Sequence, residues 1–193
     1  MSYNVSFISL GCAKNQVNCE QMMALCAEAG YSIQAQPEGC DVVVVNTCGF
    51  LASACEEAIE NILEMAELKN AGQVKKILVT GCMTQRYKED IFHELPEVDG
   101  IMGTGCFGDI VPALEQVMNG QECRHFADIN GPVEELPRVL STPRQYAYLR
   151  IAEGCSNRCA YCVIPSLRGN YRSRRMEDIL QEAQALADDG VQE

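Results

Sequence analysis

Twelve cysteines in a chain of 193 residues are the feature of this sequence with the most potential chemistry. The chain is 47% hydrophobic and 22% charged, a composition typical of globular proteins, and it has no apolar run of the roughly 18 residues that a membrane helix needs. Its first residues lack the basic and apolar segments of a secretory signal. We therefore expect a cytoplasmic protein without a membrane partner, in which cysteines bind metals more often than they form disulfides.

Three cysteines each follow a short apolar segment that is typical of a buried strand: Cys12, Cys48 and Cys82. If these strands are parallel, their carboxyl ends meet at one edge of the sheet, where ligands bind in open α/β folds. A glycine stands beside each cysteine and lets the backbone approach a bulky inorganic centre. Helix N-termini after the cysteines are expected to lower the pKa of the thiols and favour thiolates. These three residues, the first trio, are predicted to hold one metal centre.

The other six cysteines before residue 144 are expected to be structural or have no predicted role. Cys19, Cys26 and Cys55 lie on apolar helical stripes, and Cys40 precedes its strand and so lies at the opposite edge. Cys106 follows a weak strand and is the one candidate for a fourth ligand of the first trio. For Cys123 the sequence gives no role.

A second set of three cysteines is linear, with the spacing C-x3-C-x2-C: Cys155, Cys159 and Cys162. A structural zinc site would need a fourth ligand, for which His93 or His125 is available. The last two cysteines alone would suit a redox pair, but this leaves the first without a role. A four-iron cluster has four ligand positions, so this second trio would leave one iron open to a cofactor or substrate.

The elements that must position the first trio form an α/β pattern. Apolar strands are expected at residues 5–8, 42–45, 77–79 and 100–102, with amphipathic helices between and after them at 19–29, 51–66 and 110–117. This alternation predicts an open parallel sheet in an N-terminal domain over residues 1–119.

A linker and a second domain follow. Residues 120–143 contain scattered Gly and Pro and are predicted to be the linker. Residues 144–193 contain a predicted strand at 146–151, a helix at 176–186 and the start of another strand at 191–193. One strand and one helix cannot close a sheet, so we expect this part to be the first β/α unit of an incomplete domain, and the chain to be a fragment.

Positive charge is concentrated beside the second trio. The formal net charge is −12, yet residues 138–175 contain eight Arg and only one acidic residue, Glu153. This arginine belt suits either a local anionic ligand or ion pairs with the acidic first domain, and the sequence leaves both open. Five members lie within the second trio or follow it closely: Arg158, Arg168, Arg172, Arg174 and Arg175.

The C-x3-C-x2-C motif, with Tyr161 before its last cysteine, resembles that of radical S-adenosylmethionine enzymes. Together with the first trio it makes the chain similar to the methylthiotransferases of that class. The stretches SLGCAKN at 9–15, NTCGF at 46–50 and IPSLRGNYRSR at 164–174 resemble the branch that modifies an aspartate of small-subunit ribosomal protein uS12. The tRNA branch typically has Gln-Met-Asn after the first ligand cysteine and Ser-Val-Arg after the second.

The resemblance implies two 4Fe-4S clusters, one on each trio, within a fold whose second part is a truncated radical SAM (β/α) barrel. It implies that S-adenosyl-L-methionine binds the second cluster with Tyr161 near its adenine and yields a 5′-deoxyadenosyl radical, while the first cluster donates the methylated sulfur. No side chain is assigned as an acid or base. A reductant such as a flavodoxin or ferredoxin is the implied electron donor, and the fragment alone is expected to be inactive.

Two other functions remain open at this point. A tRNA adenosine methylthiotransferase would share the cofactors and differ in its substrate. A zinc-binding interaction module without catalytic activity would use the same cysteines as structural ligands.

Overall fold

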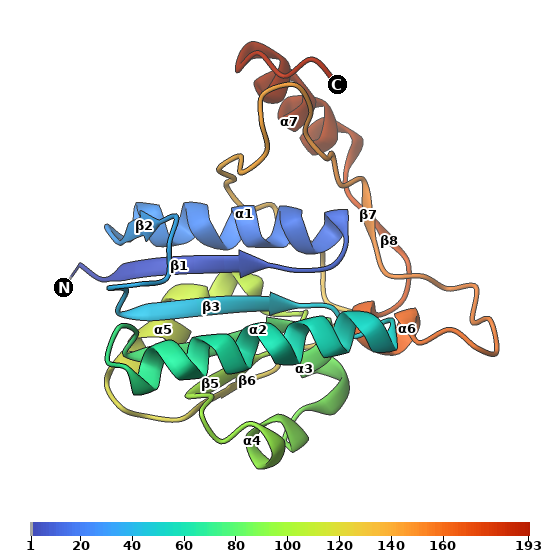
Figure 1. Ribbon diagram of the computed structural model, residues 1–193. Helices are drawn as coiled ribbons and strands as arrows, with labels where there is room; N and C mark the ends of the chain where they lie inside the picture. The colour runs from blue at the N-terminus through green and yellow to red at the C-terminus, as the bar shows by residue number, and fades with distance from the viewer. Residues whose placement is uncertain (1) are drawn as a thin grey trace.

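Six parallel strands form one sheet in the order β2-β1-β3-β4-β5-β6 in the computed structural model, which describes residues 2–193 (Figure 1). This confirms the predicted α/β class and the open parallel sheet. The strands are β1 (Asn4–Ser9), β2 (Ser32–Gln34), β3 (Val42–Thr47), β4 (Lys76–Gly81), β5 (Gly100–Met102) and β6 (Cys123–His125).

Helices cover both faces of this sheet. One core layer packs α1 and α5 against the strands through residues such as Met22 and Leu114, and the other packs α2 through Ile62. The central strand β3 is buried at all six positions, as expected for a run of four valines between two helical layers. The helical elements are α1 (Ala13–Glu28), α2 (Ala52–Asn70), α3 (Cys82–Tyr87), α4 (Asp90–Glu94), the 3-10 turn η1 (Phe107–Asp109) and α5 (Ile110–Met118).

The predicted linker contains a strand of the sheet. Residues 123–125 form β6, which pairs with β5 in parallel, and Cys123 is fully buried. The sequence pattern missed this strand because β6 is only three residues long and is surrounded by polar residues. We call residues 4–125 the sheet unit.

Beyond the linker, the predicted strand at 146–151 is wrong as to its position and length. Regular pairing is confined to β7 (Ala152–Glu153) and β8 (Arg172–Ser173), which are antiparallel. A strand needs a partner along its whole length to satisfy its backbone groups. Residues 145–147 instead meet the last residue: Glu193 N donates to Gln145 O at 3.1 Å, and Ala147 N donates to Glu193 O at 2.8 Å. That alternation is the hydrogen-bond pattern of a parallel pair.

Two helices lie in this second segment, α6 (Ile164–Arg168) and α7 (Met176–Asp188). Figure 1 shows α6 at the carboxyl ends of the sheet strands, whereas α7 lies apart from the sheet, beyond α1. The predicted helix at 176–186 is confirmed, and α6 was not predicted. Within residues 2–193, no helix is both long and apolar enough to cross a membrane.

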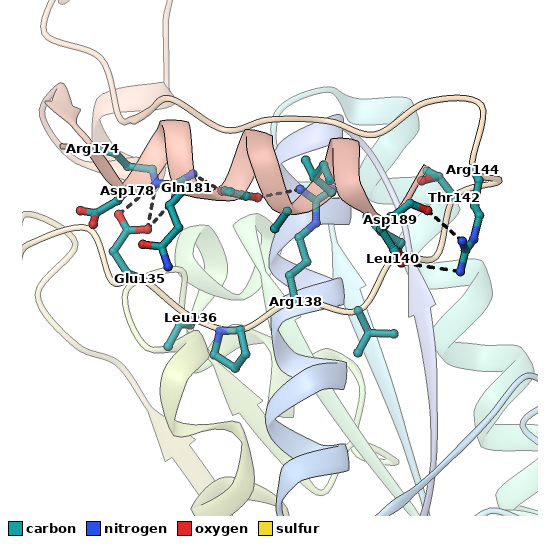
Figure 2. A pocket seen from close by; sticks show the side chains of 15 residues that line it. Glu135, Leu136, Arg138, Leu140, Thr142, Arg144, Arg174, Asp178, Gln181 and Asp189 are labelled. Carbon is teal, nitrogen blue, oxygen red and sulfur yellow. Dashed lines mark hydrogen bonds and ion pairs between the residues drawn. The ribbon is translucent and has the colours of Figure 1, made fainter. Parts of the chain in front are cut away.

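Buried ion pairs fasten the linker between α1 and α7. Glu20 of α1 is fully buried and accepts hydrogen bonds from Arg138 Nε at 2.6 Å and Ser141 N at 2.8 Å. Arg138 also pairs with Glu182 of α7 at 2.9 Å. Figure 2 shows side chains of the linker facing those of α7 around a pocket. The volume of this pocket is about 770 Å³. The linker is therefore held in place by contacts with both helices.

Candidate metal centre

The register of the sheet brings the first trio to one edge. Ser9 of β1 pairs with Asn46 of β3, and Thr47 pairs with Gly81 of β4, so the three strands end at the same level. Each cysteine follows its strand within three residues: Cys12 caps the N-terminus of α1, Cys48 follows β3 directly, and Cys82 opens α3. Between β1 and β3 the strand order reverses, which is the usual ligand-binding crevice of such sheets.

Two glycines let the three loops approach closely. A Cβ added at Gly11 would lie 2.6 Å from the Cβ of Cys48, and one added at Gly49 would lie 2.6 Å from the carbonyl oxygen of Cys82. These separations are too short for any residue other than glycine without displacement of a neighbouring loop. The backbone of two of the loops therefore packs directly on the cysteine of a neighbouring loop, Gly11 on Cys48 and Gly49 on Cys82.

Asn15, in the first turn of α1, fixes these loops to one another. Its side chain is fully buried and donates to Leu10 O and to Thr47 O, both at 2.9 Å. Its backbone carbonyl accepts a hydrogen bond from Asn46 Nδ2 at 2.7 Å. Buried amides contribute most when all their groups are paired, so Asn15 makes the edge rigid. The sequence analysis quoted this residue only as part of a motif and gave it no role.

An arginine of the second segment reaches into the same edge. Arg168, at the end of α6, is 4% exposed, and its Nε donates to the sulfur of Cys82 at 3.2 Å. Its other nitrogens donate to Asn18 Oδ1 at 2.7 Å and to Asn15 Oδ1. A carboxylate oxygen of Glu153 lies 3.4 Å from the guanidinium and balances part of its charge. The first trio thus has a buried cation as its neighbour.

The predicted effect of helix N-termini on the thiols is wrong for Cys82. Burial raises the pKa of this thiol above its ordinary value, even though the charge and hydrogen bond of Arg168 oppose the shift. The nearby thiols of Cys12 and Cys48 add to the rise. Desolvation of the thiolate by burial is the largest cause of this shift.

The first trio is graded from buried to open. Cys82 is 6% exposed, Cys48 is half-buried and Cys12 is exposed. Within residues 2–193 no three Cys, His, Asp or Glu side chains lie close enough together to hold a single metal ion. A cluster of several irons spaces its thiolates more widely than one ion does, and three soft thiolates are the donor set that such clusters use. The glycine-lined edge, the thiol donors and the cationic neighbour fit an iron–sulfur cluster.

The second trio lies on a single loop, residues 154–163, which we call the motif loop. Cys155 and Cys162 are half-buried and Cys159 is exposed. The loop is closed by backbone hydrogen bonds from Cys162 N to Cys159 O at 3.0 Å and from Cys155 N to Gly169 O at 3.1 Å. The Tyr161 ring is 93% exposed and points away from the core.

The other cysteines are buried, as predicted for Cys19, Cys26, Cys40 and Cys55, and all of them except Cys19 lie in one of the two core layers. Burial raises the pKa of both Cys19 and Cys26 to about 12, which makes them inert thiols. The candidate fourth ligand, Cys106, packs in the core layer of α1 and α5, and its thiol donates to Gly103 O at 3.4 Å and His125 O at 3.3 Å. These contacts direct Cys106 to the β5–β6 side of the sheet and not to the first trio.

The arginine belt is largely internal. Arg174 pairs with Glu135 of the linker at 2.6 Å and with Glu182 of α7, and Arg172 donates to Ile129 O. The ion pairs of the five members named with the second trio are therefore made with acids of the linker and of the second segment. In residues 2–193 these five make none with the first domain, where the second interpretation expected them. Arg168 reaches the sheet unit through Cys82 and two asparagines. Of the five members named with the second trio, two are exposed to solvent and available to an anionic partner: Arg158 and Arg175.

Curated relatives match this chain along nearly its whole length. The ribosomal protein uS12 methylthiotransferase RimO of Caldicellulosiruptor saccharolyticus is 48% identical over 192 residues, which cover 98% of this chain and 43% of that protein. The protein of the same name from Clostridioides difficile is 47% identical over 190 residues, with the same two coverages. The chain spans less than half the length of these relatives.

A solved structure is similar to the fold. It is the radical S-adenosylmethionine methyltransferase TsrM of Kitasatospora setae with cobalamin and a [4Fe-4S] cluster bound, matched with a TM-score of 0.61 over 99% of this chain and 47% of that chain. At 12% identity this match supports the fold alone. Residues 4–103, more than half of the chain, match the model of the family described as "Uncharacterized protein family UPF0004". The chain therefore belongs to the UPF0004 family.

Proposed function

We propose that this chain carries the two cluster-binding segments of a radical S-adenosylmethionine methylthiotransferase that modifies an aspartate of ribosomal protein uS12. The observation that carries the proposal is the convergence of Cys12, Cys48 and Cys82 at one edge of the sheet, beside a segment with the C-x3-C-x2-C motif. Relatives at 45–48% identity that align with both segments bear the name ribosomal protein uS12 methylthiotransferase RimO.

Each trio is proposed to hold one 4Fe-4S cluster, and S-adenosyl-L-methionine is proposed to occupy the fourth ligand position on the second trio. When bound, these groups supply the one-electron and sulfur chemistry that no side chain performs. The exposed Tyr161 ring, on the motif loop itself, is the proposed contact for adenine. The donor sets are proposed to consist of cysteines only. Of the two histidines, His125 is paired with Asp109 at 2.7 Å on the edge strand β6, and His93 lies in α4.

The chain's own contribution is placement. Asn15 and the glycines hold three loops together, and the sheet unit buries Cys82 away from water. The motif loop is fastened to this edge by α6, because Leu167 is 1% exposed and Arg168 enters the first trio. Lys14, two residues after Cys12, donates to Ala152 O at 2.6 Å and adds a second tie to β7. The two trios are thereby held by one rigid set of contacts.

The domain division is proposed with one change. The N-terminal domain of residues 1–119 extends to β6, so that the linker runs from about residue 126 to 143. Residues 144–193 are proposed as the first β/α unit of a radical SAM barrel. The hydrogen bonds of Glu193 to Gln145 and Ala147 support this proposal, because they are those of the parallel pair that a barrel needs on either side of α7. A cytoplasmic location and reduction by a flavodoxin or ferredoxin complete the proposal.

Anaerobic reconstitution tests the cofactors. The chain is incubated with iron and sulfide, desalted, and analysed for iron, zinc and its Mössbauer spectrum. Two clusters correspond to about eight irons per chain and broad visible absorbance. A colourless protein with stoichiometric zinc would instead make it a zinc-binding module, and four irons would leave one trio without its proposed role.

The substrate requires a separate test. Residues 1–193 are joined to the remaining C-terminal part of the Caldicellulosiruptor RimO protein, and the reconstituted chimaera is incubated with S-adenosyl-L-methionine, a reductant, and either uS12 or tRNA. A methylthio group on a uS12 aspartate is the expected product. Methylthio groups found only on tRNA adenosine would overturn the substrate assignment.

A further inference from the structure

Arg168 is the most completely enclosed cation of the described chain that touches a proposed ligand. Its side chain is 4% exposed and lies over the Phe107 ring, with 5.7 Å from the guanidinium carbon to the ring centroid. Its three nitrogens contact Cys82, Asn15, Asn18 and Glu153. Burying a guanidinium costs free energy unless its charge and its donors are satisfied, so a position like this one needs a compensating anion.

Glu153 supplies only part of that compensation. Its carboxylate is 3.4 Å from Arg168 and is shared with Arg150 at 3.4 Å and Lys14 at 3.5 Å, so one anion faces three cations. Arg168 Nε donates instead to the sulfur of Cys82, at 3.2 Å. The second negative group at this point is therefore the thiolate that Cys82 becomes when it binds iron.

Arg168 and the next residue contact both trios. The Arg168 side chain hydrogen-bonds the sulfur of Cys82, and the carbonyl of Gly169 accepts the backbone N–H of Cys155 at 3.1 Å. Two consecutive residues at the end of α6 thus touch one cysteine of each trio. The contacts differ in kind, since the first trio receives a full positive charge and the second a backbone hydrogen bond only.

We propose that Arg168 is a positioning residue that sets the reduction potential of the cluster on Cys12, Cys48 and Cys82 through its hydrogen bond to the Cys82 sulfur. The inference rests on the proposed function, because it requires a cluster on the first trio. Hydrogen bonds to ligand sulfurs and the local net charge are the main protein contributions to the potential of such clusters. Water does not screen the charge of Arg168, because the side chain is buried.

The direction of the effect follows from charge balance. Reduction adds one electron to the cluster and breaks no bond, so the reduced form carries one more negative charge. A fixed cation and a donated hydrogen bond stabilise the reduced form more than the oxidised form, and they raise the potential. Removing them must make the cluster harder to reduce. No such cation acts on the second trio, since within residues 2–193 no arginine donates to its sulfurs.

The test measures the midpoint potential of the first cluster alone. In the full chain with Cys155, Cys159 and Cys162 replaced by alanine, Arg168→Met and Arg168→Lys are compared by anaerobic dithionite titration followed by electron paramagnetic resonance. Arg168→Met is expected to shift the midpoint to more negative potential, and Arg168→Lys, which keeps the charge, to shift it less. Because Arg168→Met removes one of the three cations around Glu153, the double variant Arg168→Met/Glu153→Gln is titrated as well. Glu153→Gln alone is the control that keeps the contact to Cys82.

The outcomes separate this inference from the proposed function. The chain in which only Cys155, Cys159 and Cys162 are replaced by alanine is the background chain. If it reconstitutes without iron, the proposed function is contradicted. A background chain with about four irons, whose midpoint is unchanged in Arg168→Met and in the double variant, overturns the role of Arg168 and leaves the cluster assignment intact. A more negative midpoint in both variants, with iron content retained, supports the inference.

Discussion

The two trios of cysteines are built in opposite ways. The first is assembled from three strand ends up to 70 residues apart in sequence, on a fully formed sheet, with a buried cysteine, a buried asparagine and a buried arginine. The second lies on eight consecutive residues of one loop, with Cys159 exposed and a tyrosine open to solvent. The first site is shaped by tertiary structure and the second by local spacing.

This difference matches what each site is proposed to do. A loop that keeps its cysteines and Tyr161 accessible can admit and release a cofactor, because little backbone has to move. A centre surrounded by packed strands and a buried guanidinium keeps its position relative to the chain. The contact of α6 with the sheet unit gives the open site a fixed distance from the rigid one.

The largest expected effect is loss of one cluster at a time. Replacing Cys12, Cys48 and Cys82 by alanine should remove about four of about eight irons, and replacing Cys155, Cys159 and Cys162 should remove the other four. The two losses should be independent, because each trio supplies its own three ligands. Iron analysis and Mössbauer spectra of the reconstituted chains measure this.

A control for that experiment is Cys40→Ala, which removes a buried thiol at the opposite edge of the sheet and should leave the iron content unchanged. If replacing the second trio by alanine also removed the iron of the first trio, the two sites would depend on each other. The independence of the two sites would then be contradicted.

The next largest effect is on the free energy of unfolding, and it compares an asparagine of each site. Asn15→Ala removes two donors from buried carbonyls and an acceptor from Arg168, so we expect a loss of about 2–4 kcal/mol in the free energy of unfolding. Asn157, on the motif loop, is exposed, and Asn157→Ala should change the free energy by less than about 0.5 kcal/mol. Urea unfolding of the iron-free chains measures both. Equal losses would mean that the motif loop is as tightly packed as the sheet edge.

Much of the sheet unit was predictable from the sequence, because its strands are apolar and its helices have regular stripes. Four valines in β3 and the stripe of α2 each point to one structure. β6 and α6 were missed because they are three and five residues long and take their stability from their neighbours. The strand predicted at 146–151 failed because it has a pairing partner only at residue 193.

The cysteines of the site could be found from spacing, but their surroundings could not. The convergence of the first trio follows from the rule that parallel strands share their carboxyl edge. The roles of Asn15 and Arg168 depend on a contact across more than 150 positions, which no periodicity reports. The predicted lowering of the thiol pKa failed for the same reason, because the burial of Cys82 is a property of the packed edge.

A smaller loss of stability is expected from adding a side-chain atom where two loops are in close contact. In Gly49→Ala the new Cβ would lie 2.6 Å from the carbonyl oxygen of Cys82, and we expect a loss of about 1–3 kcal/mol as the α3 end moves away. Gly131→Ala is the matched control, since its Cβ would meet only Asp128 O, at 3.2 Å, and should cost less than about 1 kcal/mol. Iron content after reconstitution adds a second measurement. A Gly49→Ala chain as stable as the control would show that the three loops do not need their close approach.

The smallest effect leaves the fold unchanged and concerns the order in which the thiols react with an alkylating agent. In the iron-free chain at pH 8, iodoacetamide should alkylate the exposed Cys12 and Cys159 first, and Cys82 more slowly because burial both shields it and raises its pKa.

Cys19 and Cys26, with pKa values of about 12, should stay unmodified until the chain unfolds. At a pH three or more units below its pKa, a thiol is almost entirely protonated and has almost no reactive thiolate. The two core thiols should therefore remain protected at pH 7 and at pH 9. Peptide mass spectrometry at timed intervals gives the order. If Cys82 were alkylated as rapidly as Cys159, the first trio would be as open to solvent as the motif loop. That result would contradict the difference between the two sites.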